Sequence, residues 1–207
     1  MKEDFDPSYD DNNNQDRLVK LEDMFSDTAY YYFDVNEWEG IIDHYLNTLR
    51  VEKAIKALDF AQYQHPNSAE LYLKQAEVLM EQNEHNKAIA VLKKLQETYP
   101  FNPDIFIGMG DAYSRKMEHY NAIINYKTAL ELCEDGKEEI YFQLAAECQS
   151  LEKPAQAIYW LKVMLSEFPD SIEGLYEMAF CYEVNGTQEA GTEFFKTFLH
   201  SNPYNHH

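Results

Sequence analysis

The sequence predicts an all-α protein built from repeated pairs of helices, and three observations support this. Proline-containing segments recur at Pro66, Pro100, Pro169 and Pro203, which are 34, 69 and 34 residues apart. Glycine and proline are scarce, at seven each in 207 residues, which disfavours turn-rich β architectures. A small residue that opens an apolar run recurs midway between the prolines, at Ala54, Ala88, Ala122, Ala157 and Gly191.

The composition indicates a folded, acidic protein. Hydrophobic residues make up 45% and aromatic residues 14% of the chain, enough for a real core. The formal charge of -20 makes nucleic acids and anionic membranes poor partners and favours a cationic one. Cys133, Cys148 and Cys181 lack C-x-x-C spacing, so we expect buried thiols in a reducing compartment. Glycine-rich phosphate loops are absent, which argues against nucleotide binding of that kind.

The N-terminal segment differs from the rest of the chain. Residues 1–15 are rich in Asp and Asn, and we expect a mobile acidic tail there. Residues 16–34 predict a capping helix and connector, since Leu18, Leu21, Met24 and Phe25 share one helical face. The polar N-terminus is unlike a signal peptide and no apolar run approaches 18 residues, so the expected location is cytoplasmic.

The repeated units share a register. Counted from Val35, Ala69, Pro103, Glu138 and Ile172, position 4 is Trp38, Tyr72, Phe106, Tyr141 or Leu175, and position 11 is Tyr45, Leu79, Tyr113, Cys148 or Tyr182. This pattern resembles the tetratricopeptide repeat family, whose 34-residue unit reads W-x2-L-G-x2-Y, then A-x3-F, then proline. The resemblance implies a right-handed α-solenoid of five such helix-turn-helix repeats behind an N-terminal capping helix. The array would occupy 35–207, with repeats at 35–68, 69–102, 103–137, 138–171 and 172–205 and the start of a sixth at the end.

Two departures from the family pattern concern glycine. The glycine of position 8 survives only as Gly110. The third unit has Glu134 in place of its proline and one additional residue, and we expect Gly136 to stop its second helix.

The resemblance also implies the function. Members of the family usually capture a peptide or protein segment in a concave groove lined by positions 2, 5 and 9 of each first helix. In this chain the groove would be acidic in the first repeats and apolar in the last, so a basic or apolar segment would suit it. The predicted groove residues are Glu39, Asp43, Glu70, Leu73, Glu77, Asp104, Ile107, Asp111, Phe142, Tyr176 and Phe180.

Other positions complete this interpretation. Chaperone-tail receptors of the family use lysine and asparagine at positions 5 and 9, where this chain has carboxylates or apolar groups, so that role is disfavoured. A row of lysines should lie on the convex back, at Lys93, Lys127, Lys162 and Lys196. Ordinary solvation would also account for the aligned acids, helix propensity for the lysines, and helix packing for part of the apolar patch.

Chemistry is conceivable at two places. The stretch "EWEGIIDHY" places Glu39 and Asp43 on one helical face, but the repeat register makes Trp38 and Tyr45 packing residues, which favours a binding surface. Glu84, His85, Glu118 and His119 occupy equivalent turns, yet packed repeats stand about 10 Å apart, too far for shared metal ligands. The sequence therefore predicts no catalytic residue, no metal and no cofactor.

A structural role is the alternative. No polar capping helix follows the fifth repeat, so its outer face would serve as a homo-oligomer contact or as the junction to further repeats. The terminal His206 and His207 would fit either a sixth repeat or the remnant of a tag.

Overall fold

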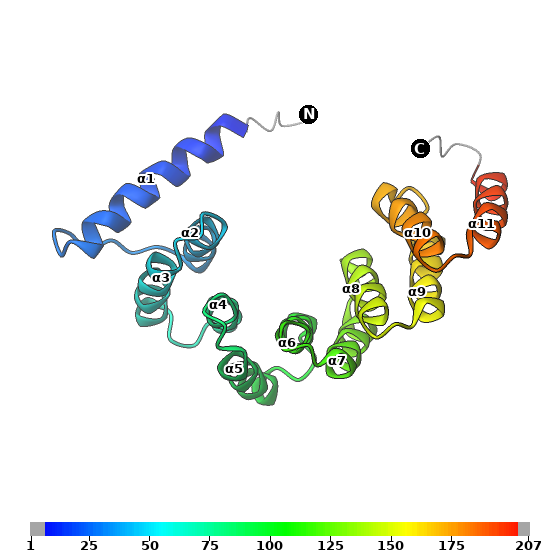
Figure 1. The fold of residues 1–207 in the computed structure, drawn as a ribbon. Coiled ribbons are helices and arrows are strands. Elements are labelled where there is room, and N and C mark those ends of the chain that lie inside the picture. The colour runs from blue at the N-terminus through cyan, green and yellow to red at the C-terminus, as the bar shows by residue number, and fades with distance from the viewer. Residues whose placement is uncertain (1–6, 203–207) are drawn as a thin grey trace. The chain divides into compact units, whose positions relative to one another are not determined.

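The computed structural model describes the backbone of residues 7–202 and the side chains of residues 16–202. Within this range the protein is all-α, which confirms the predicted fold class (Figure 1). The expectations for residues 1–6 and 203–207, which include His206 and His207, lie outside the described residues. The helices are α1 (Pro7–Phe25), α2 (Val35–Asn47), α3 (Val51–Gln64), α4 (Ala69–Glu81), α5 (His85–Thr98), α6 (Pro103–Arg115), α7 (His119–Leu132), α8 (Lys137–Ser150), α9 (Pro154–Glu167), α10 (Ile172–Val184) and α11 (Gln188–Ser201).

The helices pack in consecutive pairs within two compact units. Unit 1, Met1–Thr98, contains α1 and the pairs α2/α3 and α4/α5. Unit 2, Tyr99–His207, contains the pairs α6/α7, α8/α9 and α10/α11. Four of the residues from which we counted repeats, Val35, Ala69, Pro103 and Ile172, are the first residues of helices, whereas α8 starts one residue before Glu138.

Each turn between paired helices contains one residue in the left-handed region, at the same repeat position. In the first turn Leu49 has φ +58°, and the Arg50 amide donates to the Tyr45 carbonyl at 2.8 Å. This is a Schellman ending, which satisfies carbonyls left open by the last turn of a helix. In these five turns the residues with positive φ are Leu49, Asn83, Met117, Glu152 and Gly186. Only one is glycine, so the turns at Leu49, Met117 and Glu152 retain backbone strain of about 1 kcal/mol each, whereas asparagine at residue 83 tolerates this conformation better.

Gly136 has a different role from the predicted one. Helix α7 ends at Leu132, and the extended Cys133 follows it, so the helix stops before Gly136. Gly136 has φ +72° and directly precedes α8, without a side chain to cap that helix. The additional residue of this repeat therefore lengthens the connection into α8, where the backbone needs a left-handed residue.

Helix α1 begins at Pro7, nine residues before the predicted boundary at residue 16. Asp and Asn are weak helix formers, which is why the prediction placed a tail there. Proline suits a first helical turn, however, because the amide hydrogen that it lacks would have no partner there. Further along, Leu21 and Met24 are buried in one cluster with Trp38 and Tyr45 of α2.

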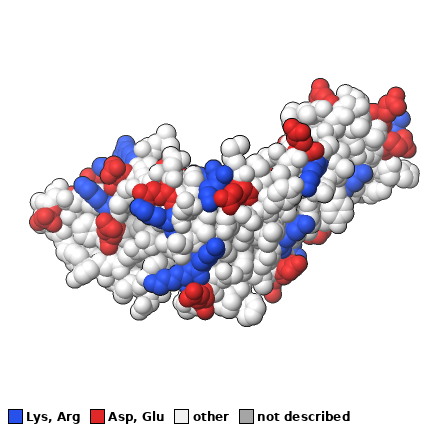
Figure 2. All heavy atoms as spheres, turned by 60° about the horizontal axis from the view of Figure 1, so that its bottom comes forward, with Lys and Arg blue, Asp and Glu red and all other residues white. Residues whose placement is uncertain are grey.

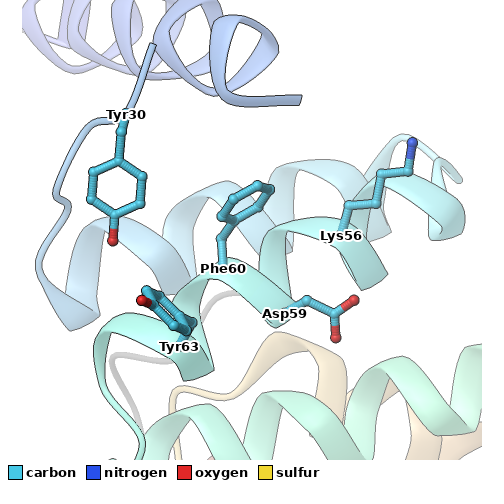
Figure 3. A pocket seen from close by; sticks show the side chains of 5 residues that line it. All are labelled: Tyr30, Lys56, Asp59, Phe60 and Tyr63. Carbon is cyan, nitrogen blue, oxygen red and sulfur yellow. The ribbon is translucent and has the colours of Figure 1, made fainter. Parts of the chain in front are cut away.

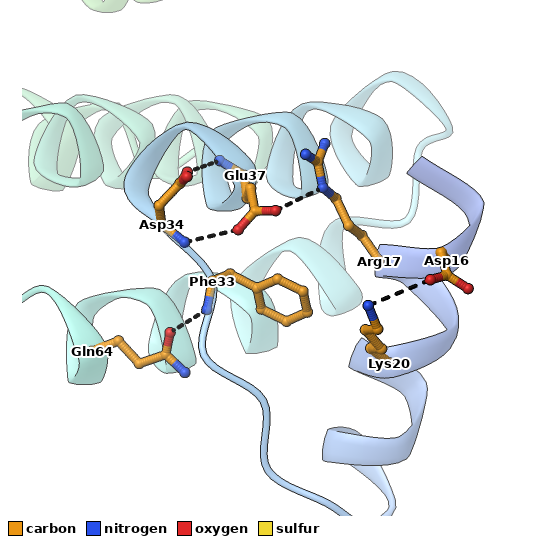
Figure 4. Close-up of polar contacts among 7 residues, drawn as sticks. All are labelled: Asp16, Arg17, Lys20, Phe33, Asp34, Glu37 and Gln64. Carbon is orange, nitrogen blue, oxygen red and sulfur yellow. Dashed lines mark hydrogen bonds and ion pairs between the residues drawn. The ribbon is translucent and has the colours of Figure 1, made fainter. Parts of the chain in front are cut away.

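Polar contacts join α1 to the start of α2 (Figure 4). The Asp34 carboxylate accepts the Glu37 amide at 2.8 Å, and the Glu37 carboxylate accepts the Asp34 amide at 3.0 Å, which forms a capping box. The other Glu37 oxygen accepts from Arg17 Nε of α1 at 3.0 Å. Glu37 of the "EWEGIIDHY" stretch is therefore used to begin a helix and hold α1.

The connector between α1 and α2 is fixed to the end of α3 by Gln64. Its side-chain oxygen accepts from the Phe33 amide at 3.1 Å and from Trp38 Nε1 at 2.9 Å, while its nitrogen donates to the Tyr31 carbonyl at 2.8 Å. His65 Nε2 lies 2.8 Å from the Phe33 carbonyl. One amide side chain thus satisfies backbone groups that no regular structure pairs.

In unit 2, Gly110 lets α6 and α7 approach closely. A Cβ at residue 110 would lie 2.4 Å from Tyr126 Cε1, so only glycine fits beneath that ring. The Tyr126 hydroxyl then reaches Asp111 Oδ1 at 2.7 Å. This is the physical reason for the single position-8 glycine that the sequence retains.

A buried carboxylate also links three helices of unit 2. Glu147 of α8 accepts from Ser114 Oγ of α6 and lies 2.7 Å from His119 Nδ1 of α7. Both carboxylate oxygens are occupied, as a buried charge requires.

Candidate functional site

Four of the predicted groove carboxylates lie around one lysine on α2 and α4. Lys74 Nζ is 2.8 Å from Asp43 Oδ1 and 2.9 Å from Glu77 Oε2. Burial by itself lowers the pKa of Lys74, but these two carboxylates outweigh it and raise the pKa above its usual value. We call Glu39, Asp43, Glu70 and Glu77, with Lys74, the carboxylate cluster.

Glu39 is the least compensated member of this cluster. Burial raises its pKa, Lys74 opposes the rise, and Glu70, Asp43 and Glu77 add to it. Among the described residues no ion pair or hydrogen bond engages its side chain. Glu39 is therefore a half-buried carboxylate that an added cation would stabilise.

Glu70 is compensated locally. Its carboxylate lies 2.6 Å from the Ser68 hydroxyl, and this hydrogen bond, together with the residue's own amide, lowers its pKa. Leu73 is half-buried beside it on α4.

The sequence interpretation did not include Lys74, although it neutralises two of the predicted residues. Its spacing of three from Glu77 is an ordinary helical ion-pair spacing and was the available signal. The other partner of Lys74, Asp43, lies 31 residues earlier in the neighbouring repeat. Its pairing with Lys74 follows only from the packing of α2 on α4.

The acidic groove residues of unit 2 are arranged differently. Asp111 accepts a hydrogen bond from the hydroxyl of buried Tyr126, so this carboxylate helps to join the two helices of its own repeat. Burial, and next Asp111, raise the pKa of Tyr126, which keeps the phenol protonated as the donor. Asp104 is exposed in the first turn of α6, where its charge favours the helix N-terminus, and Ile107 is half-buried.

An apolar surface runs along α10. Its side chains are exposed to 42% at Ile172, 73% at Tyr176, 52% at Phe180 and 66% at Val184. Residues four apart lie on one helical face, so these four form a continuous row, which we call the α10 stripe. The prediction included Tyr176 and Phe180 but missed Ile172 and Val184, which the same spacing would have found.

Phe142 of α8 belongs more to the core than to this surface. It is half-buried and packs against the hydrophobic cluster of α8, α9 and α10. Next to the α10 stripe, Gln149 Nε2 of α8 donates to Glu177 Oε1 at 2.7 Å and lies 3.0 Å from Cys181 Sγ. These contacts fix α8 and α10 relative to each other within unit 2.

The cysteines are in poor environments for nucleophilic chemistry. Cys148 and Cys181 are buried, and Cys133 is partly buried. Burial raises the pKa of all three thiols, in Cys181 to about 11. A raised thiol pKa reduces the thiolate that would react.

Two lysines of the row on the second helices contact aromatic rings. Lys127 Nζ lies 5.4 Å from the Trp160 ring centroid, and Lys162 Nζ lies 5.4 Å from that of Phe194. Each pair joins one repeat to the next at equivalent positions, which gives these lysines a packing role. The face drawn in Figure 2 carries both signs of charge interspersed with uncharged residues.

Three of the four residues in the paired Glu-His turns have separate local partners. Glu84 pairs with Lys87 and Glu118 with Lys116, while His119 contacts Glu147. In the part of the chain that the structure describes, no group of three or more His, Cys, Asp or Glu side chains is arranged to hold a metal ion. Nor is any helix of that part long and apolar enough to cross a membrane.

Comparisons with known proteins agree with the repeat pattern. A sequence model of the tetratricopeptide repeat matches residues 50–109. No curated protein matches the chain in sequence. Among solved structures, MamA is similar with a TM-score of 0.61 and 22% identity, over 84% of this chain and 97% of that chain.

Two further structures have the same fold. TTC0263, described as a thermophilic TPR protein in Thermus thermophilus, has a TM-score of 0.62 and 16% identity, over 82% of this chain and 92% of its own. PilF of Pseudomonas aeruginosa has a TM-score of 0.64 and 18% identity, over 80% of this chain and 75% of its own. At such identities the likeness concerns the fold.

Proposed function

We propose, from the premise that this chain is a tetratricopeptide repeat protein, that it binds a basic or apolar segment of another protein on the faces of its first helices. Proteins of this family generally act as protein-protein interaction scaffolds. The proposal adds the location of the surface and the chemistry of its partner.

The α10 stripe carries the proposal. Four large apolar side chains in one row remain exposed on a helix whose other face packs in the core. Burying such surface is favourable by about 25 cal/mol per Å². Contiguous exposed apolar surface in a soluble protein generally marks an interaction site.

The carboxylate cluster supports the basic part of the proposal. Asp43 and Glu77 both pair with Lys74, and Glu39 lies among these carboxylates without a counter-ion of its own. A lysine or arginine of a partner would supply the missing charge. The net charge of -20 would also attract a cationic segment from a distance.

Peptide binding tests the apolar surface directly. We would measure fluorescence polarisation of amphipathic peptides with basic, neutral or acidic polar faces, using the full chain. Replacing Phe180 with alanine should weaken binding about tenfold, the loss typical of a central interface aromatic. Phe101→Ala is the matched control, because Phe101 is 79% exposed but lies in the turn before α6, and it should change affinity by less than about twofold.

Charge is tested separately. Basic peptides should bind most tightly, and their affinity should fall as salt is raised. Glu39→Gln should reduce that salt dependence. Preference for acidic peptides, or equal effects of Phe180→Ala and Phe101→Ala, would contradict the proposal.

The α10 stripe also favours one alternative, a homo-oligomer through the last repeat. Two copies could bury their stripes against each other. Light scattering of dilute protein distinguishes the two functions: a dimer that Phe180→Ala dissociates would support the alternative, and a monomer would exclude it.

A further inference from the structure

Unit 1 has an apolar pocket on a different surface from the first-helix faces (Figure 3). Tyr30 of the connector forms one side, and Lys56, Asp59, Phe60 and Tyr63 of α3 form the rest. Its volume is about 430 Å³, within the usual range for ligand pockets. We call it the tyrosine pocket.

Two of its aromatic rings are open to solvent. Tyr30 is 61% exposed and Tyr63 is 78% exposed, whereas Phe60 between them is partly buried and packs on Phe25 of α1 at 6.0 Å between ring centroids. Figure 3 shows the Tyr30, Phe60 and Tyr63 side chains on the same side of α3. The two tyrosine rings therefore form an exposed aromatic surface, and Phe60 forms the floor of the pocket between them.

The pocket is held in shape before any ligand arrives. The Tyr30 hydroxyl accepts from Gln64 Nε2 at 3.2 Å, and the same nitrogen donates to the Tyr31 carbonyl. Gln64 also bonds the Phe33 amide and Trp38, so the connector that carries Tyr30 is fixed to α3. A preformed site loses less conformational entropy on binding.

Of the two charged side chains at the pocket, Asp59 is more available to a ligand than Lys56. Lys56 Nζ lies 5.8 Å from the centroid of the Phe25 ring, and Figure 3 shows its ammonium directed away from the two tyrosines. Among the described residues, no hydrogen bond or ion pair engages the Asp59 carboxylate, which lies four residues before Tyr63 and therefore on the same helical face. The pocket thus offers a carboxylate next to an exposed aromatic ring.

We propose that the tyrosine pocket binds an extended peptide segment that carries an arginine next to an apolar residue. The guanidinium pairs with Asp59 and stacks on Tyr63, while the apolar side chain lies between Tyr30 and Phe60. Arginine fits better than lysine because its planar group stacks on aromatic rings and binds carboxylates with two donors. This binding is independent of the first-helix faces.

Charge complementarity selects this occupant over two others. A second copy of the chain also has a charge of -20 and would be repelled. An acidic segment would be repelled by Asp59 and by the negative charge of the whole chain. Lys56, the cation that lines the pocket, would not offset this repulsion, because its ammonium lies over the Phe25 ring.

The test uses the full chain and short labelled peptides of glycine and serine with one central Leu-Arg pair. Companion peptides replace arginine by lysine, by glutamate, or by citrulline, which keeps the shape of arginine without its charge. Fluorescence polarisation measures affinity, and amide chemical shifts locate the bound peptide. The arginine peptide should bind most tightly and shift residues 28–34 and α3.

Variants separate the two groups that recognise arginine. Asp59→Asn and Tyr63→Ala should each weaken binding about three- to tenfold, as expected for a partly exposed charge and ring contact. Glu52→Gln is the matched control, since it removes one exposed carboxylate from the same helix and should have little effect. Phe180→Ala should leave this affinity unchanged, so failure of the first-helix proposal would not affect the result.

Several results would overturn the inference. These are equal binding of the citrulline and arginine peptides, equal effects of Asp59→Asn and Glu52→Gln, shifts confined to α2, α4 or α10, and absence of binding at millimolar peptide. Self-association that Tyr63→Ala abolishes would instead assign the pocket to a second copy.

Discussion

Gly110 offers the sharpest test of how the repeats pack. In Gly110→Ala the new methyl carbon would lie 2.4 Å from Tyr126 Cε1 and 2.6 Å from Cδ1, well inside van der Waals contact. The ring cannot move aside easily, because Tyr126 is 1% exposed and its hydroxyl is bonded to Asp111 at 2.7 Å. Helices α6 and α7 must therefore separate, or the tyrosine must leave its position.

Two opposing effects set the magnitude. Overpacking of a close-packed interior destabilises by about 1–3 kcal/mol. Alanine in place of glycine within a helix stabilises by about 0.5–1 kcal/mol. We therefore expect a net loss of about 1–2 kcal/mol in the free energy of unfolding.

Gly40 provides the matched control. It lies within α2 as Gly110 lies within α6, but a Cβ at Gly40 would meet no atom within 4 Å. Gly40→Ala causes no overpacking, so only the higher helix propensity of alanine acts, and it should stabilise the protein by about 0.5–1 kcal/mol. The two identical substitutions thus have opposite predicted signs.

Urea unfolding followed by circular dichroism, with the urea dependence compared between variants, measures both changes. In a Tyr126→Ala background the obstructing ring is gone, so Gly110→Ala should become stabilising, as a double-mutant cycle would show. If Gly110→Ala stabilises the unmodified protein as Gly40→Ala does, the packing argument is wrong.

Three further predictions concern the turns, the carboxylate cluster and the buried Glu147. Leu49→Gly should stabilise the protein by about 0.5–1 kcal/mol, and so raise the thermal midpoint, because Leu49 is exposed with φ +58°. Asn83→Gly should change the midpoint less, because asparagine tolerates this backbone conformation. The folded pKa of Glu39 is raised, so its ionisation removes stability as pH rises above 4.5, and Glu39→Gln should stabilise the protein relative to the unmodified chain more at pH 7 than at pH 4, as unfolding curves would show. Glu147→Leu should destabilise by about 1–3 kcal/mol at neutral pH, because the Ser114 hydroxyl and His119 lose their acceptor, and an unchanged urea midpoint would refute this.

The fold was predictable because repetition appears directly in the sequence. A helix pair cannot bury its apolar face alone, so each 34-residue unit repeats the same packing residues. Trp38 and Tyr45 are buried at the positions that the register assigns to packing. The left-handed turn residues were not predictable in this way, because hydrogen bonding of the helix end holds Leu49 and Met117 in a backbone that their side chains disfavour.

The candidate site was only partly predictable. The register placed Asp43, Glu77 and Asp111 at one repeat position, yet their partners differ. Lys74 neutralises the first two across α2 and α4, while Tyr126 holds the third within its own repeat. Equivalent positions in different repeats thus have different electrostatic environments, because the side chains that surround each carboxylate come from other helices.

The sequence by itself determined the helix pairs, their spacing and the side chains that each helix buries, since these depend on periodicity within about 34 residues. Only the tertiary structure decided which polar and aromatic groups are left for a partner. It placed Lys74 among the carboxylates, left the α10 stripe uncovered, and fixed Tyr30 above α3 through Gln64. The reason is that exposure and pairing depend on contacts between segments about one repeat apart, which hydrophobic periodicity does not encode.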